Sequence, residues 1–310
     1  MTVPLRDYPF EYQTHLGSFC SWREKQSQQL EENDLNTAAF QGETGAYSEW
    51  AAQEYFGAEW QVLPCRTFRD VFTALHESRV QAAVVPIENS LAGSVHQNYD
   101  LLLQYDLHIT GEIILRISHH VMVLPGVRWE QVRRVYSHPQ ALEQCRDFLE
   151  RRPELEIVPA YDTAGSAKLI VENGWREAAA IAGAPAAAHY GLEVLHRSVE
   201  SNQQNFTRFL ILNQTALTPA AHGKTSIVFS SPHKPGALFK ALAVFALRDI
   251  NLLKIESRPQ HGSPWHYFFY LDFEGTPLSS NCQKALEHLR ELSDFMRVLG
   301  FYEKGKVIAS

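Results

Sequence analysis

The sequence predicts an α/β fold with a largely parallel sheet, followed by a smaller β-α-β-β-α-β module. Short apolar runs alternate with helical patterns from Thr37 to Leu212, which is typical of α/β domains. Residues 215–224 are rich in Thr, Pro, Ala and Gly and indicate a linker. After this linker the order of elements changes to that of a ferredoxin-like module of about 80 residues.

In the first part, each expected strand is a short apolar run, and an amphipathic helical stretch follows most of them. The expected strands are residues 38–41, 61–64, 82–86, 134–137, 156–160, 178–182 and 207–212, with a further apolar stretch at 121–124. The expected helices are residues 47–56, 68–76, 95–103, 129–133, 139–150, 163–172 and 184–190. The last strand, 207–212, is expected to close the sheet.

The second part gives a different alternation of the same two patterns. Its expected strands are residues 225–230, 250–258, 265–273 and 295–302, and its expected helices are residues 236–247 and 281–292. The order strand, helix, strand, strand, helix, strand predicts the ferredoxin-like module.

Length and composition are those of an ordinary globular protein with two domains, or with one large domain and a small one. The chain has 310 residues, of which 45% are hydrophobic and 20% charged. A formal charge of -7 without a basic stripe argues against nucleic acid as a partner. No apolar run approaches the ~18 residues that cross a bilayer, and we expect no membrane partner.

The N-terminal region and the cysteines indicate the compartment. Residues 1–36 are polar and cannot build a core, so we expect a tail or a short docked helix. This region also lacks the apolar core of a signal peptide. The 4 cysteines are scattered and fit no metal-ligand spacing. We therefore expect reduced thiols, no metal site and a cytoplasmic protein.

Small polar residues recur where expected strands lead into helices. In open parallel sheets, ligands bind beyond the carboxyl ends of the strands, near free helix N–H groups. The residues at this junction are Gly42, Gly45, Glu88, Asn89, Ser90, Gly93, Ser137, His138, Asp162 and Thr163. Such a ring suits an anionic ligand with two carboxylates, although each residue also has an ordinary explanation as a helix cap or turn residue. The sequence contains no G-x-G-x-x-G pattern and therefore gives no indication of a dinucleotide cofactor.

The run NFTRFL, residues 205–210, places Thr207 and Arg208 side by side at the entry to an apolar strand. A hydroxyl next to a fixed cation suits a small anionic substrate, because arginine binds carboxylates and the hydroxyl donates a hydrogen bond. A strand start with a surface arginine would explain the run equally well. Glu88, directly after an apolar strand, could shape the charge of a site or only hydrogen-bond loop amides.

Six short motifs occur in the order found in prephenate dehydratases, and from about Ala38 onward the chain closely resembles that family. The motifs are GETGAYSE, PIENSLAGSV, YSHPQAL, DTAGSA, AAIA and NFTRF. The module after the linker resembles an ACT domain, and its two marks are PGALF (235–239) and ESRP (256–259).

The resemblance implies a domain organisation. It consists of a polar extension at 1–36, a catalytic domain at 37–214, a linker at 215–224 and an ACT regulatory domain at 225–310. The catalytic domain would have two α/β lobes around a cleft, similar to periplasmic binding proteins. Because the N-terminal extension is too short for a chorismate mutase unit, the resemblance implies a monofunctional enzyme.

The implied reaction is decarboxylation of prephenate with loss of its ring hydroxyl, giving phenylpyruvate, carbon dioxide and water. It needs no cofactor, because aromatisation drives it and the protein supplies position and protonation. Thr207 matches the catalytic threonine of the family and is expected to protonate the leaving hydroxide, with help because threonine is a poor acid. Arg208 is expected to pair with a substrate carboxylate, or else to brace the loop. The other expected substrate contacts are Glu88, Asn89, Ser90, Gly93, Thr163, Ser166, Asn205 and Phe209.

The ACT resemblance implies feedback inhibition by L-phenylalanine. The residues expected around this ligand are Pro235, Gly236, Ala237, Leu238, Glu256, Ser257, Arg258 and Pro259. The ESRP run would line the neighbouring subunit's side of the site, so we expect a homodimer or homotetramer. A module that only dimerises is the alternative.

Four further points stay open. Ala46 stands where the family often has Ser or Thr, and residues 201–205 do not align cleanly with the family pattern. Arogenate dehydratase, which performs the same chemistry on an amino acid, is the near rival. A non-catalytic amino-acid or solute-binding sensor is the alternative of another class.

Overall fold

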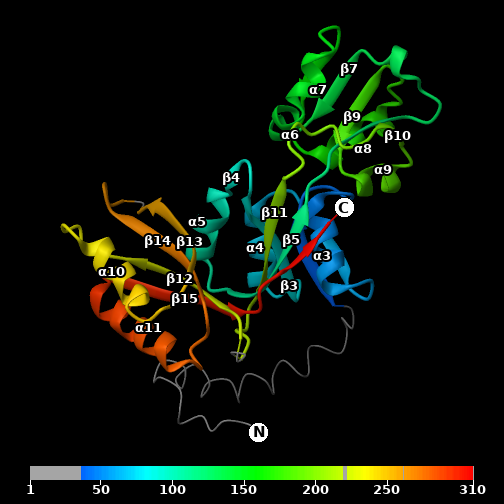
Figure 1. Ribbon diagram of the computed structural model, residues 1–310. Coiled ribbons are helices and arrows are strands. Elements are labelled where there is room, and N and C mark those ends of the chain that lie inside the picture. Colours follow the sequence, from blue (N-terminus) through cyan, green and yellow to red (C-terminus); the bar gives the residue numbers. More distant parts are fainter. Residues whose placement is uncertain (1–35, 219–221, 261, 310) are drawn as a thin grey trace. The chain divides into compact units, whose positions relative to one another are not determined.

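The computed structural model describes residues 36–218, 222–260 and 262–309. From Thr37 onward the chain forms one compact unit with three β-sheets of seven, five and four strands (Figure 1). The polar extension expected at 1–36 lies outside the described residues, apart from Asn36. Among the described helices, none is long and apolar enough to cross a membrane.

The seven-stranded sheet forms the first lobe, in the order β16-β5-β11-β3-β1-β2, with β4 paired to β3. Its strands are β1 (Thr37–Gln41), β2 (Gln61–Cys65), β3 (Ala82–Asn89), β4 (Gly93–Ser94), β5 (His108–Arg116), β11 (Phe206–Asn213) and β16 (Lys306–Ile308). Its helices are α3 (Tyr47–Phe56), α4 (Phe68–His76) and α5 (His96–Gln104). β1 runs parallel to β2 and β3, as expected, but β11 runs antiparallel to both β3 and β5. The expectation of a largely parallel sheet is therefore wrong for the strand that carries Thr207.

The five-stranded sheet forms the second lobe, in the order β10-β6-β9-β7-β8. Its strands are β6 (His120–Val123), β7 (Arg134–Ser137), β8 (Glu156–Pro159), β9 (Ala178–Ala182) and β10 (Glu193–His196). Its helical elements are η3 (Trp129–Gln131), α6 (Pro139–Gln144), α7 (Arg146–Glu150), α8 (Thr163–Asn173) and α9 (Ala184–Tyr190). The single helix expected at 139–150 is two helices, because Cys145 adopts a non-helical ψ of 17°.

Two chain segments connect the lobes, one from β5 to β6 and one from β10 to β11. They are hydrogen-bonded to each other, from Ile117 N to Asn205 O at 2.8 Å and from Val199 N to His119 O at 2.9 Å. The carboxylate of Glu200, in the second segment, accepts from His119 N at 2.9 Å. The first lobe is therefore completed by β11, after the chain has passed through the second lobe.

The last sheet confirms the predicted ferredoxin-like module. Its strands β12 (Lys224–Ser230), β13 (Leu252–Pro259), β14 (Tyr267–Glu274) and β15 (Phe295–Tyr302) are antiparallel, in the order β13-β14-β12-β15. Helices α10 (Ala237–Ala246) and α11 (Ser280–Leu292) lie together beside this sheet (Figure 1) and share one apolar core with it.

The opposite face of this sheet packs on the first lobe. Val228, Tyr270 and Leu299 from the sheet are buried in the same apolar cluster as Tyr99 and Leu102 of α5. The hydroxyl of Tyr270 donates to the Tyr99 carbonyl oxygen at 2.7 Å. Burial of such large side chains stabilises the contact between the first lobe and the C-terminal module.

Candidate active site

Thr207 lies in the middle of the seven-stranded sheet, on β11 between β3 and β5. It is opposite Asn89 and Leu115, and its side chain is almost buried. The β11–β3 pairing contains a bulge, because Arg208 pairs with Glu88 whereas Phe209 pairs with Pro86. Beyond this bulge the side chain of Asn89 comes into hydrogen-bond contact with Thr207.

Asn89 fixes the hydrogen bonding of Thr207. Its Oδ1 accepts from the backbone N–H groups of Leu91 at 3.0 Å and Ala92 at 2.9 Å. Because a backbone N–H only donates, the amide can be oriented in one way, with Nδ2 facing Thr207. Nδ2 donates to Thr207 Oγ1 at 3.0 Å, so the hydroxyl hydrogen of Thr207 is left for another acceptor.

The same reasoning extends to three further side chains. Asn89 Nδ2 also donates to Asn205 Oδ1 at 2.7 Å, and Asn205 Nδ2 donates to Gln144 Oε1 at 3.0 Å. His119 Nε2 lies 2.8 Å from the same Gln144 oxygen. Asn205 and His119 are buried and Gln144 is half-buried, so most of this chain of amides is shielded from water.

Gln144 and His119 were not among the residues predicted for the site. Gln144 lies two residues after the motif YSHPQAL, and this closeness to a family motif is the sequence signal that could have identified it. His119 carries no such signal, because only the crossing of the two connecting segments brings it to the site.

Of the predicted contacts, the structure gathers Asn89, Asn205 and Thr207 around one point. Ser90 Oγ instead donates to Gln204 O and accepts from Phe206 N, both at 2.9 Å, which ties the β3–β4 turn to β11. Ser166 is fully buried, and its Oγ donates to Asp162 O at 2.8 Å.

The remaining predicted contacts have other surroundings. Gly93 is the first residue of β4, exposed and with φ of 81°, and it pairs with Asn89. Thr163 is the first residue of α8 and is half-buried. Phe209 is buried in an apolar core cluster of the first lobe. Their roles in substrate binding stay predictions.

The two lobes meet at the start of α3. Gly45 has φ of 88°, and a Cβ there would lie 2.7 Å from Ala186 Cα at the start of α9. Glu43 Oε2 pairs with Lys168 Nζ of α8 at 3.0 Å. Ala46, the residue before α3, offers no side-chain cap. Only glycine fits at position 45, because both the backbone conformation and the close approach exclude a side chain.

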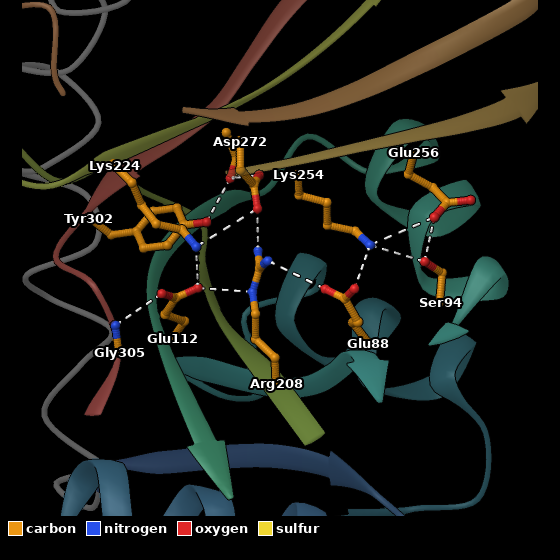
Figure 2. A network of polar contacts seen from close by, with 11 residues as sticks. Glu88, Ser94, Glu112, Arg208, Lys224, Lys254, Glu256, Asp272, Tyr302 and Gly305 are labelled. Atoms are coloured by element: carbon orange, nitrogen blue, oxygen red, sulfur yellow. Dashed lines mark hydrogen bonds and ion pairs between the residues drawn. The ribbon is translucent and has the colours of Figure 1, made fainter. Parts of the chain in front are cut away.

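Arg208 points away from the amide chain, toward the C-terminal sheet. Successive residues of a strand face opposite sides of the sheet, so the side chains of Thr207 and Arg208 contact different parts of the protein. Figure 2 shows its guanidinium among three carboxylates. Asp272 Oδ2 lies 2.6 Å from Nη2, Glu112 Oε2 lies 2.9 Å from Nε and Glu88 Oε2 lies 3.8 Å from Nη1. Burial alone would lower the pKa of Arg208, but Asp272, Tyr302 and Glu112 raise it above its ordinary value.

Asp272 and Lys224 complete this buried charge cluster from the C-terminal sheet. Lys224 Nζ lies 2.7 Å from Glu112 Oε2, and Ser226 Oγ donates to Asp272 Oδ1 at 2.5 Å. Burial raises the pKa of Asp272, but Arg208 and Lys224 outweigh this effect and hold it below its ordinary value. The two cations and two carboxylates balance, as a buried cluster requires.

A second charge pair extends the cluster to β13. Lys254 Nζ lies 2.9 Å from Glu88 Oε1 and 3.7 Å from Glu256 Oε2 (Figure 2). Glu256 also accepts from Ser94 Oγ and lies 3.3 Å from His96 Nε2. Glu88 therefore contacts cations on the side of the sheet that Arg208 occupies.

The residues predicted for a regulatory ligand fall into three places. Arg258 pairs with Asp100 of α5 at 2.8 Å, so Arg258 contacts the first lobe, as Glu256 does through His96. Ser257 and Pro259 alternate with them along β13 and are exposed. The rest surround the start of α10: Pro235, Gly236, Ala237 and Leu238. Gly236, with φ of 77°, is exposed there, and a Cβ on it would meet nothing within 4 Å.

Comparison with known proteins agrees with this architecture. A family model described as prephenate dehydratase matches residues 38–216, and one described as ACT domain matches residues 225–287. The chain belongs to the prephenate dehydratase family. It is accordingly a carbon–oxygen lyase of aromatic amino acid biosynthesis, with an ACT domain after the catalytic part.

One relative and two solved structures illustrate the similarity. Arogenate dehydratase/prephenate dehydratase 2 from Arabidopsis thaliana is 45% identical over 293 residues, which cover 89% of this chain and 76% of the relative. The prephenate dehydratase of Arthrobacter aurescens, solved with L-Phe, superposes with a TM-score of 0.80 at 33% identity, over 86% of this chain and 90% of its own. GqqA, described as a quorum quenching acylase, also gives a TM-score of 0.80, at 36% identity, over 87% of this chain and 98% of its own.

Proposed function

We propose that the chain converts prephenate to phenylpyruvate, with Thr207 as the proton donor to the leaving hydroxide. The observation that carries the proposal is the hydrogen bond from Asn89 Nδ2 to Thr207 Oγ1. It leaves the hydroxyl hydrogen of Thr207 free for a substrate oxygen, and it stabilises negative charge on Oγ1 when that hydrogen is transferred. This is the help that a poor acid such as threonine needs.

The electron flow requires no cofactor. The C–C bond to the ring carboxylate breaks and releases carbon dioxide, and its electron pair forms a ring double bond as the C–O bond to the ring hydroxyl breaks. The departing hydroxide takes the proton of Thr207 and leaves as water, and the side chain is later reprotonated from solvent. Aromatisation supplies the driving force, so the protein's task is orientation and proton delivery.

Arg208 serves in this proposal as the brace of β11, which is one of the two roles expected for it. Its guanidinium is engaged by Asp272 and Glu112. The substrate carboxylates are instead bound by N–H groups where α3 and α8 begin. In support, the starts of these two helices lie close together, since a Cβ on Gly42, in the segment before α3, would lie 3.1 Å from Oδ2 of Asp162, the residue before α8. Free N–H groups at helix N-termini bind anions.

Regulation by L-phenylalanine, a homo-oligomeric state and a cytoplasmic location belong to the same proposal. The ACT family match supports the first, as does the Arthrobacter aurescens enzyme, which was solved in complex with L-Phe. Exposed Leu253 and Ile255 on the edge strand β13 support pairing of two ACT sheets. The free thiols Cys65, Cys145 and Cys282 fit a reducing compartment, although the Arabidopsis relative is named as chloroplastic.

Arogenate is the second candidate substrate, because the name of the Arabidopsis relative includes both activities. The test measures phenylpyruvate formed from prephenate and phenylalanine formed from arogenate, each with and without added phenylalanine. An N-acyl amide substrate serves as a third arm, because GqqA is described as an acylase. Turnover of prephenate at the higher kcat/KM supports the proposal, and turnover of neither dehydratase substrate by folded protein overturns it.

A further inference from the structure

We infer that His119 is a positioning residue for the reaction, which holds Gln144 so that its amide nitrogen is presented to the substrate. The inference rests on the proposed function of the site around Thr207. His119 Nε2 lies 2.8 Å from Gln144 Oε1, the oxygen that also accepts from Asn205 Nδ2 at 3.0 Å. With its oxygen held by two donors, the Gln144 side chain can be oriented in one way.

The direction of each bond follows from the backbone. The N–H groups of Leu91 and Ala92 fix the amide of Asn89, which donates to Asn205 Oδ1. Asn205 must then donate through Nδ2, and its partner on Gln144 must be the oxygen. Since that oxygen cannot donate, His119 carries its hydrogen on Nε2. Backbone amides far away in the sequence therefore determine the tautomer of His119.

The remaining contacts of His119 fix its ring in place. The hydroxyl of Tyr47 on α3 donates to Ser118 O at 2.7 Å, and its oxygen lies 3.3 Å from Nδ1 of His119. The two rings pack edge to face with centroids 5.8 Å apart. Its backbone N–H donates to Glu200, which also accepts from Ser118 Oγ at 3.2 Å. Burial lowers the pKa of His119 below its ordinary value, against the raising effect of Gln144 and Glu200, and so favours the neutral ring.

The location of His119 makes this role specific. It stands on the segment that connects the lobes, and it touches Tyr47 from the first lobe and Gln144 from the second. The Gln144 amide nitrogen has no protein partner within the described part of the chain, and the side chain is only half-buried. It is thus an available hydrogen-bond donor whose direction depends on His119.

Two substitutions separate positioning from mere packing. In His119→Gln, the amide nitrogen reaches the place of Nε2 and can still donate to Gln144. In His119→Asn, the shorter amide reaches only the place of Nδ1, near Tyr47. We expect kcat of His119→Gln within about threefold of the unsubstituted enzyme, and about a 100-fold loss of kcat for His119→Asn, with similar melting temperatures. Equal losses for both variants would overturn the inference.

A double-mutant cycle measures the coupling between His119 and Gln144, which a purely structural role of His119 would not produce. If His119 acts through Gln144, introducing His119→Asn into the Gln144→Ala variant should lower kcat by less than about twofold. Full additivity of the two losses would contradict the inference.

A measurement without turnover separates this inference from the proposed function. In ¹⁵N-labelled protein, the imidazole of His119 should carry hydrogen on Nε2 and none on Nδ1, and the Nε2 signal should shift in Gln144→Ala. Finding the hydrogen on Nδ1 overturns the inference even if the enzyme is active. An unsubstituted enzyme that turns over neither prephenate nor arogenate, with the expected tautomer, overturns only the proposed function.

Discussion

Arg208 and Asp272 form an ion pair that joins the strand carrying Thr207 to the ACT sheet, with Nη2 and Oδ2 2.6 Å apart. Arg208 is the residue directly after Thr207, and Asp272 lies 64 positions further along the chain. One face of β11 thus carries Thr207 and its hydrogen bond to Asn89, while Arg208 on the other face is neutralised by a carboxylate of the ACT sheet. Strand β11 and the ACT sheet are therefore joined by a buried contact at this point.

Replacing Asp272 by Asn should destabilise the protein strongly. The change leaves the buried cation of Arg208 without one of its two close carboxylates, and breaking a buried pair costs about 3 kcal/mol or more. Urea unfolding monitored by circular dichroism measures the loss. Asp294→Asn, at an exposed position of the same domain, is the matched control and should change the free energy of unfolding by less than about 0.5 kcal/mol. A loss below about 1 kcal/mol for Asp272→Asn would contradict this view of the cluster.

The ionisation of Asp272 should also make the free energy of unfolding depend on pH. Its pKa is held low in the folded protein, mainly by Arg208 and Lys224, which outweigh the effect of burial. The unfolded state therefore binds the proton more readily, and stability falls with pH below the unfolded pKa of about 4. Relative to the unsubstituted protein, the deficit of Asp272→Asn should be largest above about pH 5 and shrink on acidification. A deficit that grows toward low pH would have the wrong sign.

Lys254 should couple the ACT domain to the catalytic sheet. It lies between Glu88 on β3 and Glu256 on β13, so Lys254→Gln removes the cation between the two carboxylates. We expect kcat without effector to stay within about twofold. The concentration of phenylalanine that halves activity should rise at least about fivefold, a typical size for coupling between sites. The control is the exposed Lys284→Gln, and an unchanged phenylalanine response in Lys254→Gln would rule out this coupling.

Gly45 should be required for closure of the cleft. Gly45→Ala puts a methyl group 2.7 Å from Ala186 Cα, whereas Gly57 has a similar φ of 81° and open space around it. Both substitutions strain the backbone by about 1 kcal/mol, but only the first separates the lobes. Steady-state kinetics should show kcat/KM reduced at least about tenfold in Gly45→Ala and nearly unchanged in Gly57→Ala. Equal kinetics for the two variants would count against a role of this contact.

Local patterns predicted much of the fold, because they reflect burial and helix or strand period. The helices 47–56, 68–76 and 184–190 begin and end where expected. Strands β4, β5, β10 and β16 were missed. For β5, the run HITGEIILR contains a glycine and a glutamate that break the strand pattern. That glutamate, Glu112, faces Arg208 and Lys224, which is why a charged residue is stable inside the sheet.

For the site, the motif residues Asn89, Asn205 and Thr207 come together, because they lie on or beside two adjacent strands of one sheet. The surroundings of the Arg208 side chain, on the other side of this sheet, were harder to predict. It depends on which sheet covers the far side of β11, and that is set by contacts between residues far apart in sequence. Gln144 and His119 depend in the same way on how the two lobes meet.

The most direct test of the central claim is the turnover of prephenate by Thr207→Val and Thr207→Ser. Valine keeps the shape of threonine without the hydroxyl, and serine keeps the hydroxyl without the methyl group. If Thr207 donates the proton, Thr207→Ser should retain kcat within about tenfold. Thr207→Val should lose about 10²–10⁴-fold, at an unchanged melting temperature and with prephenate still bound. A Thr207→Val enzyme that forms phenylpyruvate at nearly the unsubstituted rate would contradict the account.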